Sequence, residues 1–203
     1  MKTTLRIANA ITILFRPFYL PLAGLAALFL FSVLNILPYS YRLFIIVIVW
    51  LFTVILPQVL IAIYHKTHGL QFLPFVSREH RSVPYAISII CYFSCYWLLA
   101  TMNAHHTIKA VLIAALVVQM VCALINIKQK ISTHMAGIGS FLGGLLAFSY
   151  IFYFNPVWWF CVVNLVAGII GTCRMILRQH TLQEIIYGYL VGFVGALVTI
   201  LLV

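Results

Sequence analysis

The residues best suited to chemistry are a histidine and a glutamate that lie close together near the end of the chain. If the segment from Thr181 onward is helical, His180 and Glu184 lie one turn apart on one face. A carboxylate in that place can take a hydrogen bond from one imidazole nitrogen and leave the other nitrogen basic. Arg174, which precedes His180 by six positions, could hold an oxyanion such as phosphate. Together these residue types are a minimal set for a histidine that acts as nucleophile or base on a phosphate ester.

The composition places these residues in a membrane protein. Of the 203 residues, 65% are hydrophobic and 7% are charged. About 20 consecutive apolar residues span a bilayer, and the sequence contains six or seven such runs. We therefore predict an all-α fold, a polytopic membrane helix bundle of six to seven transmembrane helices. We expect an integral, multi-pass protein of a bacterial cytoplasmic (inner) membrane.

The chain divides into a short leading segment and one membrane domain. Residues 1–16 mix polar and apolar types, which predicts an interfacial helix. Residues 17–203 hold the apolar runs, and Pro57 should kink the second of them. Glycines spaced closely over 137–144 and 188–195 predict helices that pack at short distance. The expected spans are roughly 19–37, 43–64, 85–102, 108–127, 135–154, a sixth that ends near 176, and 182–203.

Counting spans predicts which loops meet. With seven spans, the loops 65–84, 128–134 and 174–181 share one membrane face and hold most of the basic residues. Ionisable residues at a membrane boundary are by default a functional hypothesis. The residues expected to converge on this face are Arg78, Arg81, Lys128, Lys130, His134, Arg174 and His180.

The charge balance points to lipid partners. The net charge is +10, and Glu79 and Glu184 are the only acidic residues. Because the basic residues lie in loops between spans, we expect membrane lipids as partners and no nucleic acid. The other histidines lie in loops on opposite faces of the membrane, so we predict no metal site. These histidines are His65, His68, His80, His105 and His106.

Three polar segments follow one another in a distinctive pattern. Cys173-Arg174 is followed after five residues by His180 and after three more by Glu184. Ile131-Ser132-Thr133-His134 precedes it, and the basic segment 76–84 comes earlier still. Over roughly residues 65–190, this order resembles the type 2 phosphatidic acid phosphatase superfamily. The family's motifs are Lys-x6-Arg-Pro, Pro-Ser-Gly-His and Ser-Arg-x5-His-x3-Asp.

The sequence departs from these motifs at several positions. Cys173 stands where the third motif has serine, and Glu184 stands where it has aspartate. In the first motif Pro84 is kept, while Val76 and Val83 occupy the lysine and arginine positions. Two arginines shifted along the same loop could serve in their place.

The resemblance implies a role for each matching residue. His180 would be the nucleophile and form a phosphohistidine, and Glu184 would orient it. His134 would protonate the leaving lipid alcohol and then activate water. The implied enzyme needs no metal or cofactor and acts on a lipid phosphate substrate, such as phosphatidic acid, phosphatidylglycerol phosphate, an isoprenyl diphosphate or a lipid A phosphate. The residues implied to hold the phosphate are Arg174, Arg81, Arg78, Lys130 and Ser132.

Plainer interpretations stand beside these roles. Thr181 and Glu184 have the spacing of a capping box at the start of the last helix, a role that is compatible with catalysis. His134 could simply accompany its polar neighbours at a helix start. The alternative function is a non-catalytic relative of the same fold that binds phospholipid headgroups.

Overall fold

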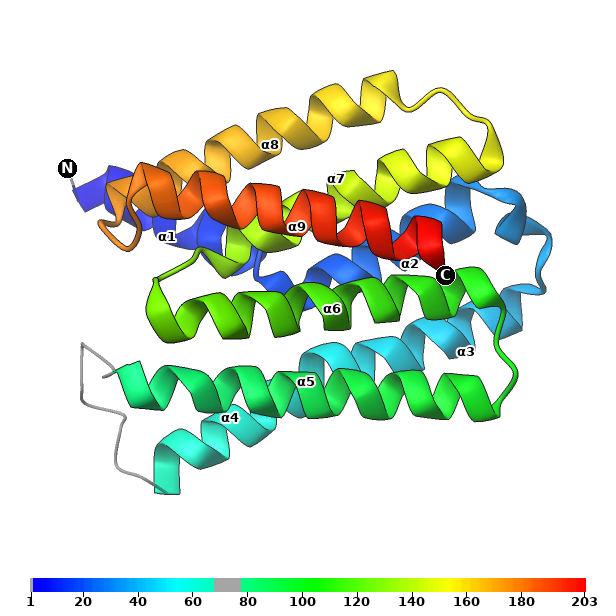
Figure 1. The fold of residues 1–203 in the computed structure, drawn as a ribbon, viewed down its shortest axis with the longest axis horizontal. Coiled ribbons are helices and arrows are strands. Elements are labelled where there is room, and N and C mark those ends of the chain that lie inside the picture. The colour runs from blue at the N-terminus through cyan, green and yellow to red at the C-terminus, as the bar shows by residue number, and fades with distance from the viewer. Residues whose placement is uncertain (1, 68–77) are drawn as a thin grey trace.

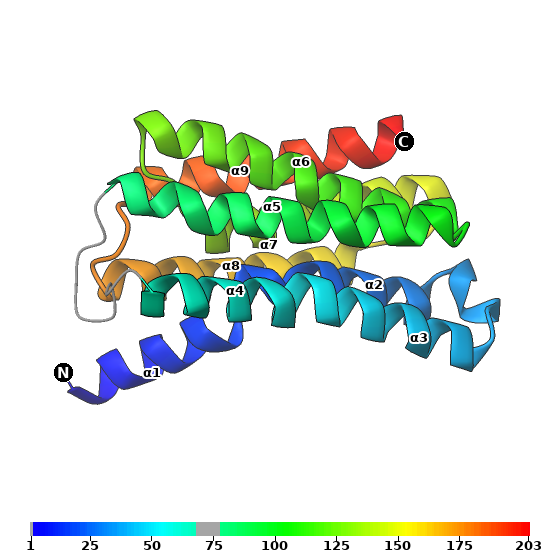
Figure 2. The ribbon, with the colours of Figure 1, turned by 90° about the horizontal axis from the view of Figure 1, so that it is seen from below.

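The molecule is a bundle of helices that run along one long axis (Figure 1, Figure 2). The computed structural model describes residues 2–67 and 78–203, with the side chains of all of these except residues 2, 3, 33 and 78–82. Seven helical stretches are long and apolar enough to cross a membrane, so the predicted all-α membrane bundle is confirmed. The elements in chain order are α1 (Lys2–Leu14), η1 (Pro17–Tyr19), α2 (Leu20–Phe31), η2 (Val33–Ile36), α3 (Tyr39–Trp50), η3 (Leu51–Ile55), α4 (Leu56–Thr67), α5 (Arg78–Thr101), α6 (His106–Lys128), α7 (Thr133–Phe152), α8 (Val157–Ile176) and α9 (Leu182–Leu202).

The first apolar helical stretch begins nearer the amino terminus than expected. The stretch Thr4–Phe31, which includes α1 and α2, is long and apolar enough to cross a membrane as a whole. In both views α1 runs beside the end of α8 along the bundle axis, and the two helices are in contact (Figure 1, Figure 2). The assignment of residues 1–16 to an interfacial segment stays a prediction.

The helix ends that flank the three loops predicted to meet lie at one end of the bundle. The α6–α7 and α8–α9 connections, the end of α4 and the start of α5 are all at the end where the chain begins (Figure 1). We call this the histidine end, because His134 and His180 lie there. The third span, Val83–Thr101, begins within two residues of the expected start at 85. The helix that contains it, α5, extends back to Arg78 and carries Pro84 inside it.

A seam of glycines joins α7 to α9 and sets the geometry of the histidine end. The seam consists of Gly139, Gly143, Gly188 and Gly192. A methyl group on Gly139, Gly143 or Gly192 would overlap a backbone carbonyl of the facing helix, and one on Gly188 would lie 2.6 Å from the oxygen of Ser132. Such close approach is how small residues pack membrane helices. The predicted packing role of these glycines is therefore confirmed.

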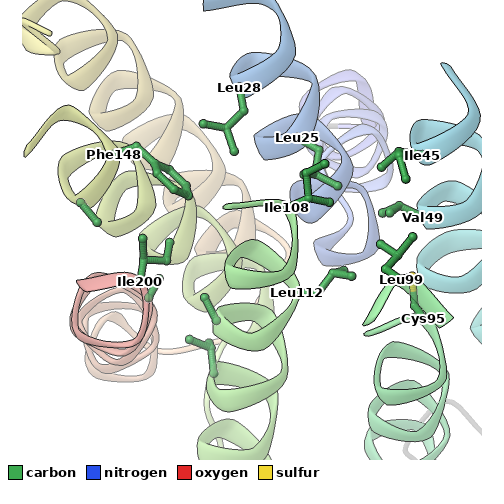
Figure 3. Close-up of a cluster of buried hydrophobic side chains, with 14 of the residues drawn as sticks. Leu25, Leu28, Ile45, Val49, Cys95, Leu99, Ile108, Leu112, Phe148 and Ile200 are labelled. Atoms are coloured by element: carbon green, nitrogen blue, oxygen red, sulfur yellow. The ribbon is translucent and has the colours of Figure 1, made fainter. Parts of the chain in front are cut away.

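The fully shielded part of the larger packed core lies in the half of the bundle farther from the histidine end, and the same core reaches Ile131 beside that end. Hydrophobic side chains from six helices pack together there (Figure 3). These helices are α2, α3, α5, α6, α7 and α9. Leu25, Ile45, Leu99, Ile108 and Leu112 are wholly shielded, with exposed fractions of 0%. This half holds the helices in register, so the site at the other end rests on a rigid frame.

The expected irregularity at Pro57 takes the form of a π-helical turn over Leu51–Ile55. A proline has no N–H to bond to the carbonyl four residues back. The amide of Leu56 bonds instead to the carbonyl of Leu51, five residues back. The irregular turn joins α3 to α4, which ends beside His65 at the histidine end.

Candidate functional site

His180 lies in the turn between α8 and α9, where Glu184 holds its ring. Its Nδ1 atom is 2.7 Å from Oε2 of Glu184, and only 8% of the His180 side chain is exposed. An ionised carboxylate accepts hydrogen bonds and donates none, so Nδ1 carries the proton and Nε2 keeps its lone pair. The contact predicted from the four-residue spacing is confirmed.

The capping interpretation of Glu184 is confirmed in part. Thr181 is the N-cap of α9, and its hydroxyl oxygen accepts a hydrogen bond of 3.4 Å from the backbone N–H of Glu184. In a full capping box the glutamate side chain would reach back to the N-cap backbone. Here the carboxylate turns to His180 instead, so one residue both starts the helix and orients the imidazole.

The turn that carries His180 is a helix-ending motif of defined geometry. The N–H of Gln179 donates to the carbonyl of Arg174, and the N–H of Arg178 donates to that of Met175. Arg178 adopts φ 51°, the left-handed conformation usual at this position. The ammonium of Lys130 donates to the carbonyl of Gln179, which ties the α6–α7 loop to this turn. The turn thus reverses the chain within a few residues and brings His180 back over the end of α8.

His134 lies near the start of α7 and is held by a distant part of the chain. Its Nε2 atom is 3.3 Å from the backbone carbonyl of Thr12 in α1. Since a carbonyl only accepts, this contact assigns the proton to Nε2 and leaves the lone pair on Nδ1. Nδ1 is buried and has no hydrogen-bond partner within the described part of the chain.

A direct backbone contact links the second and third motif segments. The N–H of Ser132 donates to the carbonyl of Glu184 at 3.3 Å. Because the glycine seam presses α7 against α9, the segment before His134 is fixed against the first turn of α9. The two histidines therefore belong to one rigid corner of the bundle.

Arg174 places a guanidinium group, whose buried Nε has no hydrogen-bond partner among the described residues, at the same corner. It lies in the last turn of α8 and is half-buried. A guanidinium offers several donors in a planar fork that suits the oxygens of a phosphate. An anion in front of Arg174 would satisfy this group.

These side chains line one large cavity of about 1110 Å³. At the histidine end its wall is polar and basic, and toward the other end it is apolar, with Phe31 and Trp159 in contact at a ring distance of 4.9 Å. Helices α2, α5, α6 and α7 supply most of the wall. The polar wall at the histidine end includes Arg16, His65, Lys130, His134, Arg174, Arg178 and His180.

The electrostatics of this end keep His180 neutral. Burial lowers the pKa of His180 below its ordinary value of 6.5, and the charges of Arg174 and Lys130 lower it further. The hydrogen bond and negative charge of Glu184 act in the opposite direction. The net direction is downward, so a neutral imidazole with a free nitrogen faces a basic pocket at pH 7.

The structure brings together most of the predicted site residues. His180, His134, Arg174 and Lys130 share the cavity wall, and Glu184 stands behind His180. Ser132 is fully buried and is not part of this wall, because its backbone is committed to α9. The side chains of Arg78 and Arg81 lie outside the described residues.

Arg16 is one of three basic cavity-wall residues that the sequence analysis did not assign to the site, with His65 and Arg178. It lies in the cavity wall, close enough for its charge to act on His134. Its backbone is extended, as expected before Pro17. The turn that follows packs on Gly137 of α7, where a Cβ would overlap the side chain of Leu20. The signal was the Arg-Pro pair at the start of the first apolar run, but its position over α7 is a tertiary feature.

Comparison with known proteins yields no relative for this chain. No family model, curated protein or solved structure matches it.

Proposed function

We propose that the protein is a membrane-embedded phosphatase that hydrolyses a lipid phosphate or diphosphate through a phosphohistidine on His180. One observation carries the proposal. A neutral, carboxylate-oriented histidine shares the polar end of a long apolar cavity with Arg174 and His134, both of which have an unpartnered buried nitrogen among the described residues. Such a cavity suits a molecule with an anionic head and a hydrocarbon tail.

Binding would use the two ends of the cavity differently. The phosphate oxygens would be neutralised by Arg174, Lys130 and Arg16. The carboxylate of Glu184 lies behind His180, outside the cavity wall, so it would not repel the phosphate. The hydrocarbon tail would lie among α2, α6 and α7, where the wall is apolar. This arrangement keeps the charge at the membrane boundary, where its desolvation costs least.

The chemistry would proceed in two displacements. In the first, Nε2 of His180 attacks phosphorus while the bond to the lipid oxygen breaks. That oxygen takes a proton from Nδ1 of His134, which has received it from the singly protonated phosphate of the substrate. Glu184 balances the positive charge that develops on the His180 ring. In the second, neutral His134 removes a proton from water as the water attacks the phosphohistidine. The inorganic phosphate that is released takes this proton with it, which restores both histidines.

The proposal is tested by looking for the intermediate and the product with the purified full chain. We expect phosphate release from at least one member of a panel of lipid phosphates and diphosphates. Rapid quenching of a reaction with phosphorus-labelled substrate should yield labelled protein whose label survives alkali and is lost in acid, as expected for phosphohistidine. Binding of these lipids without release or labelling would refute the phosphatase and favour a headgroup-binding protein.

The acid limb of the pH profile should report His180. Because the pKa of His180 is lowered, the neutral nucleophile is fully present at pH 7, and turnover should fall only as the pH drops below about 6.5. Glu184 raises this pKa, so Glu184→Gln should move the limb in the residual activity to lower pH. Rates of labelling measured between pH 5 and 8 isolate this first step. A limb that moves upward in the variant contradicts the assignment.

A further inference from the structure

The cavity extends from the histidine end almost to the opposite end of the bundle. Three helices give its length independently of one another. Its lining residues extend from Trp159 to Arg174 on α8, from Thr133 to Phe148 on α7 and from Val111 to Asn126 on α6. Each of these stretches advances by fifteen positions, which corresponds to about 22 Å of helix. A molecule whose phosphate lies at the basic end therefore has a long apolar space for its tail.

The wall of this space changes in character along its length. Between the two ends, small residues of α2, α6 and α7 leave room along the cavity. These residues include Gly24, Ala27, Ala114, Ala115 and Gly144. At the far end, where α2 stops and α8 begins, the wall is made of aromatic rings (Figure 1). The rings belong to Phe31, Phe148, Phe154 and Trp159.

Two of these rings bridge α2 and α8 across the end of the cavity. Phe31 is the last residue of α2, Trp159 lies in the first turn of α8, and their ring centroids are 4.9 Å apart. We call Phe31 and Trp159 the ring pair. Phe148 is part of the packed core and stacks on Phe152 at 5.9 Å, so its position is fixed. The ring pair is 60% and 45% exposed, so either ring can be replaced without opening the core.

We propose that the ring pair is a stop for the hydrocarbon tail, so that Phe31 and Trp159 determine which tail lengths the site accepts. This inference rests on the proposed function and adds a specificity determinant to it. The basic residues hold the phosphate at one end, so the position of the last carbon depends on the length of the tail. An extended chain advances about 1.2 Å per bond, so a cavity of about 22 Å holds roughly 16–18 carbons.

The physical basis of this selection is packing. A hydrocarbon tail is already out of water in the bilayer, so the hydrophobic effect by itself favours no particular length. A tail that is too short leaves a void before the ring pair and forfeits dispersion contacts with the wall. A tail that is too long must bend or push the two rings apart, which is overpacking. Both penalties together predict a single optimum of tail length.

The test uses a series of straight-chain alkyl phosphates that differ only in length. Each would be presented to the full chain at the same mole fraction in mixed micelles. We expect kcat/KM to be highest at roughly 16–18 carbons and to fall about tenfold when the tail is four carbons longer. Phe31→Ala and Trp159→Ala should each move the optimum to longer tails. The matched controls are their exposed neighbours outside the cavity wall, Leu30→Ala and Trp158→Ala, which should keep it.

A substitution in the opposite direction shortens the space. Ala27 lies one turn before Phe31 on the same face of α2 and lines the cavity. Ala27→Phe would place a ring about 6 Å nearer the histidine end, so the optimum should shorten by roughly five carbons. Thermal unfolding shows whether this variant is folded, and the two alanine variants of the ring pair test the stop without adding volume to the cavity.

Binding provides a readout that does not depend on turnover. Displacement of a fluorescent alkyl phosphate by the same series should give the same optimum and the same shifts in the variants. A length optimum in binding that moves with the ring pair, without phosphate release, would support the stop and refute the phosphatase. Phosphate release with no length optimum, or with an optimum that Phe31→Ala and Trp159→Ala leave unchanged, would overturn the stop and leave the phosphatase standing.

Discussion

Replacing His180 with alanine should abolish phosphate release and the labelled intermediate together, with a loss of at least about 10⁴-fold in kcat. The bond to Glu184 places the proton of the His180 ring on Nδ1. Nε2 therefore keeps the lone pair that attacks phosphorus in the proposed mechanism. No other group in the described cavity wall combines a free lone pair with a carboxylate that can balance its charge. Quenched-flow labelling and steady-state phosphate release measure the two steps.

Variants of the other site residues should lose activity in distinguishable ways. His134→Ala should slow the second step more than the first when the lipid carries a good leaving group, so label should accumulate. Glu184→Gln should cost about 10³–10⁴-fold, because an amide can donate to Nδ1 and shift the proton to Nε2. His106→Ala, at the opposite end of the bundle, is the control (Figure 1). A His180→Ala protein that folds normally and still releases phosphate would eliminate this mechanism.

Gly192→Val should prevent α7 and α9 from packing and destabilise the protein by about 3 kcal/mol or more. Even the first carbon of a side chain at this position would overlap the backbone of Ala136, which cannot move without the whole of α7. Activity should be lost as well, because the bond from Ser132 to Glu184 depends on the same contact. Thermal unfolding of the detergent-solubilised protein, followed by size-exclusion chromatography, measures the change.

A glycine outside the seam provides the comparison. Gly168 of α8 has no atom within 4 Å of the place where a Cβ would lie. Gly168→Ala should therefore keep activity and raise stability by about 0.5–1 kcal/mol, since alanine loses less backbone entropy in a helix. If Gly192→Val were as stable as Gly168→Ala, the glycine seam would not be what holds the histidine end together.

Local patterns predicted the parts of the site that depend on local geometry. The His180–Glu184 contact follows from one turn of helix, and the apolar runs predicted the spans to within a few residues at most boundaries. The helix that holds the third span extends beyond that span to Arg78, with Pro84 tolerated inside it. These features need only the periodicity of a helix and the thickness of a bilayer.

Contacts between distant segments could not be predicted in this way. Thr12 and His134 are 122 positions apart, and nothing in either segment indicates their contact. Arg16 reaches the cavity because a turn packs on Gly137. Ser132 was assigned to phosphate by its motif, yet the close approach of α9 keeps it out of the cavity wall.

The contact between α1 and His134 has a practical consequence for work with this protein. The carbonyl of Thr12 decides which ring nitrogen of His134 is available, although it belongs to a helix that a cautious design might trim or fuse to an affinity handle. A handle placed there would disturb the helix that fixes the ring of His134. The carboxyl terminus lies at the far end of the bundle, so tags and fluorescent fusions belong on that end (Figure 1).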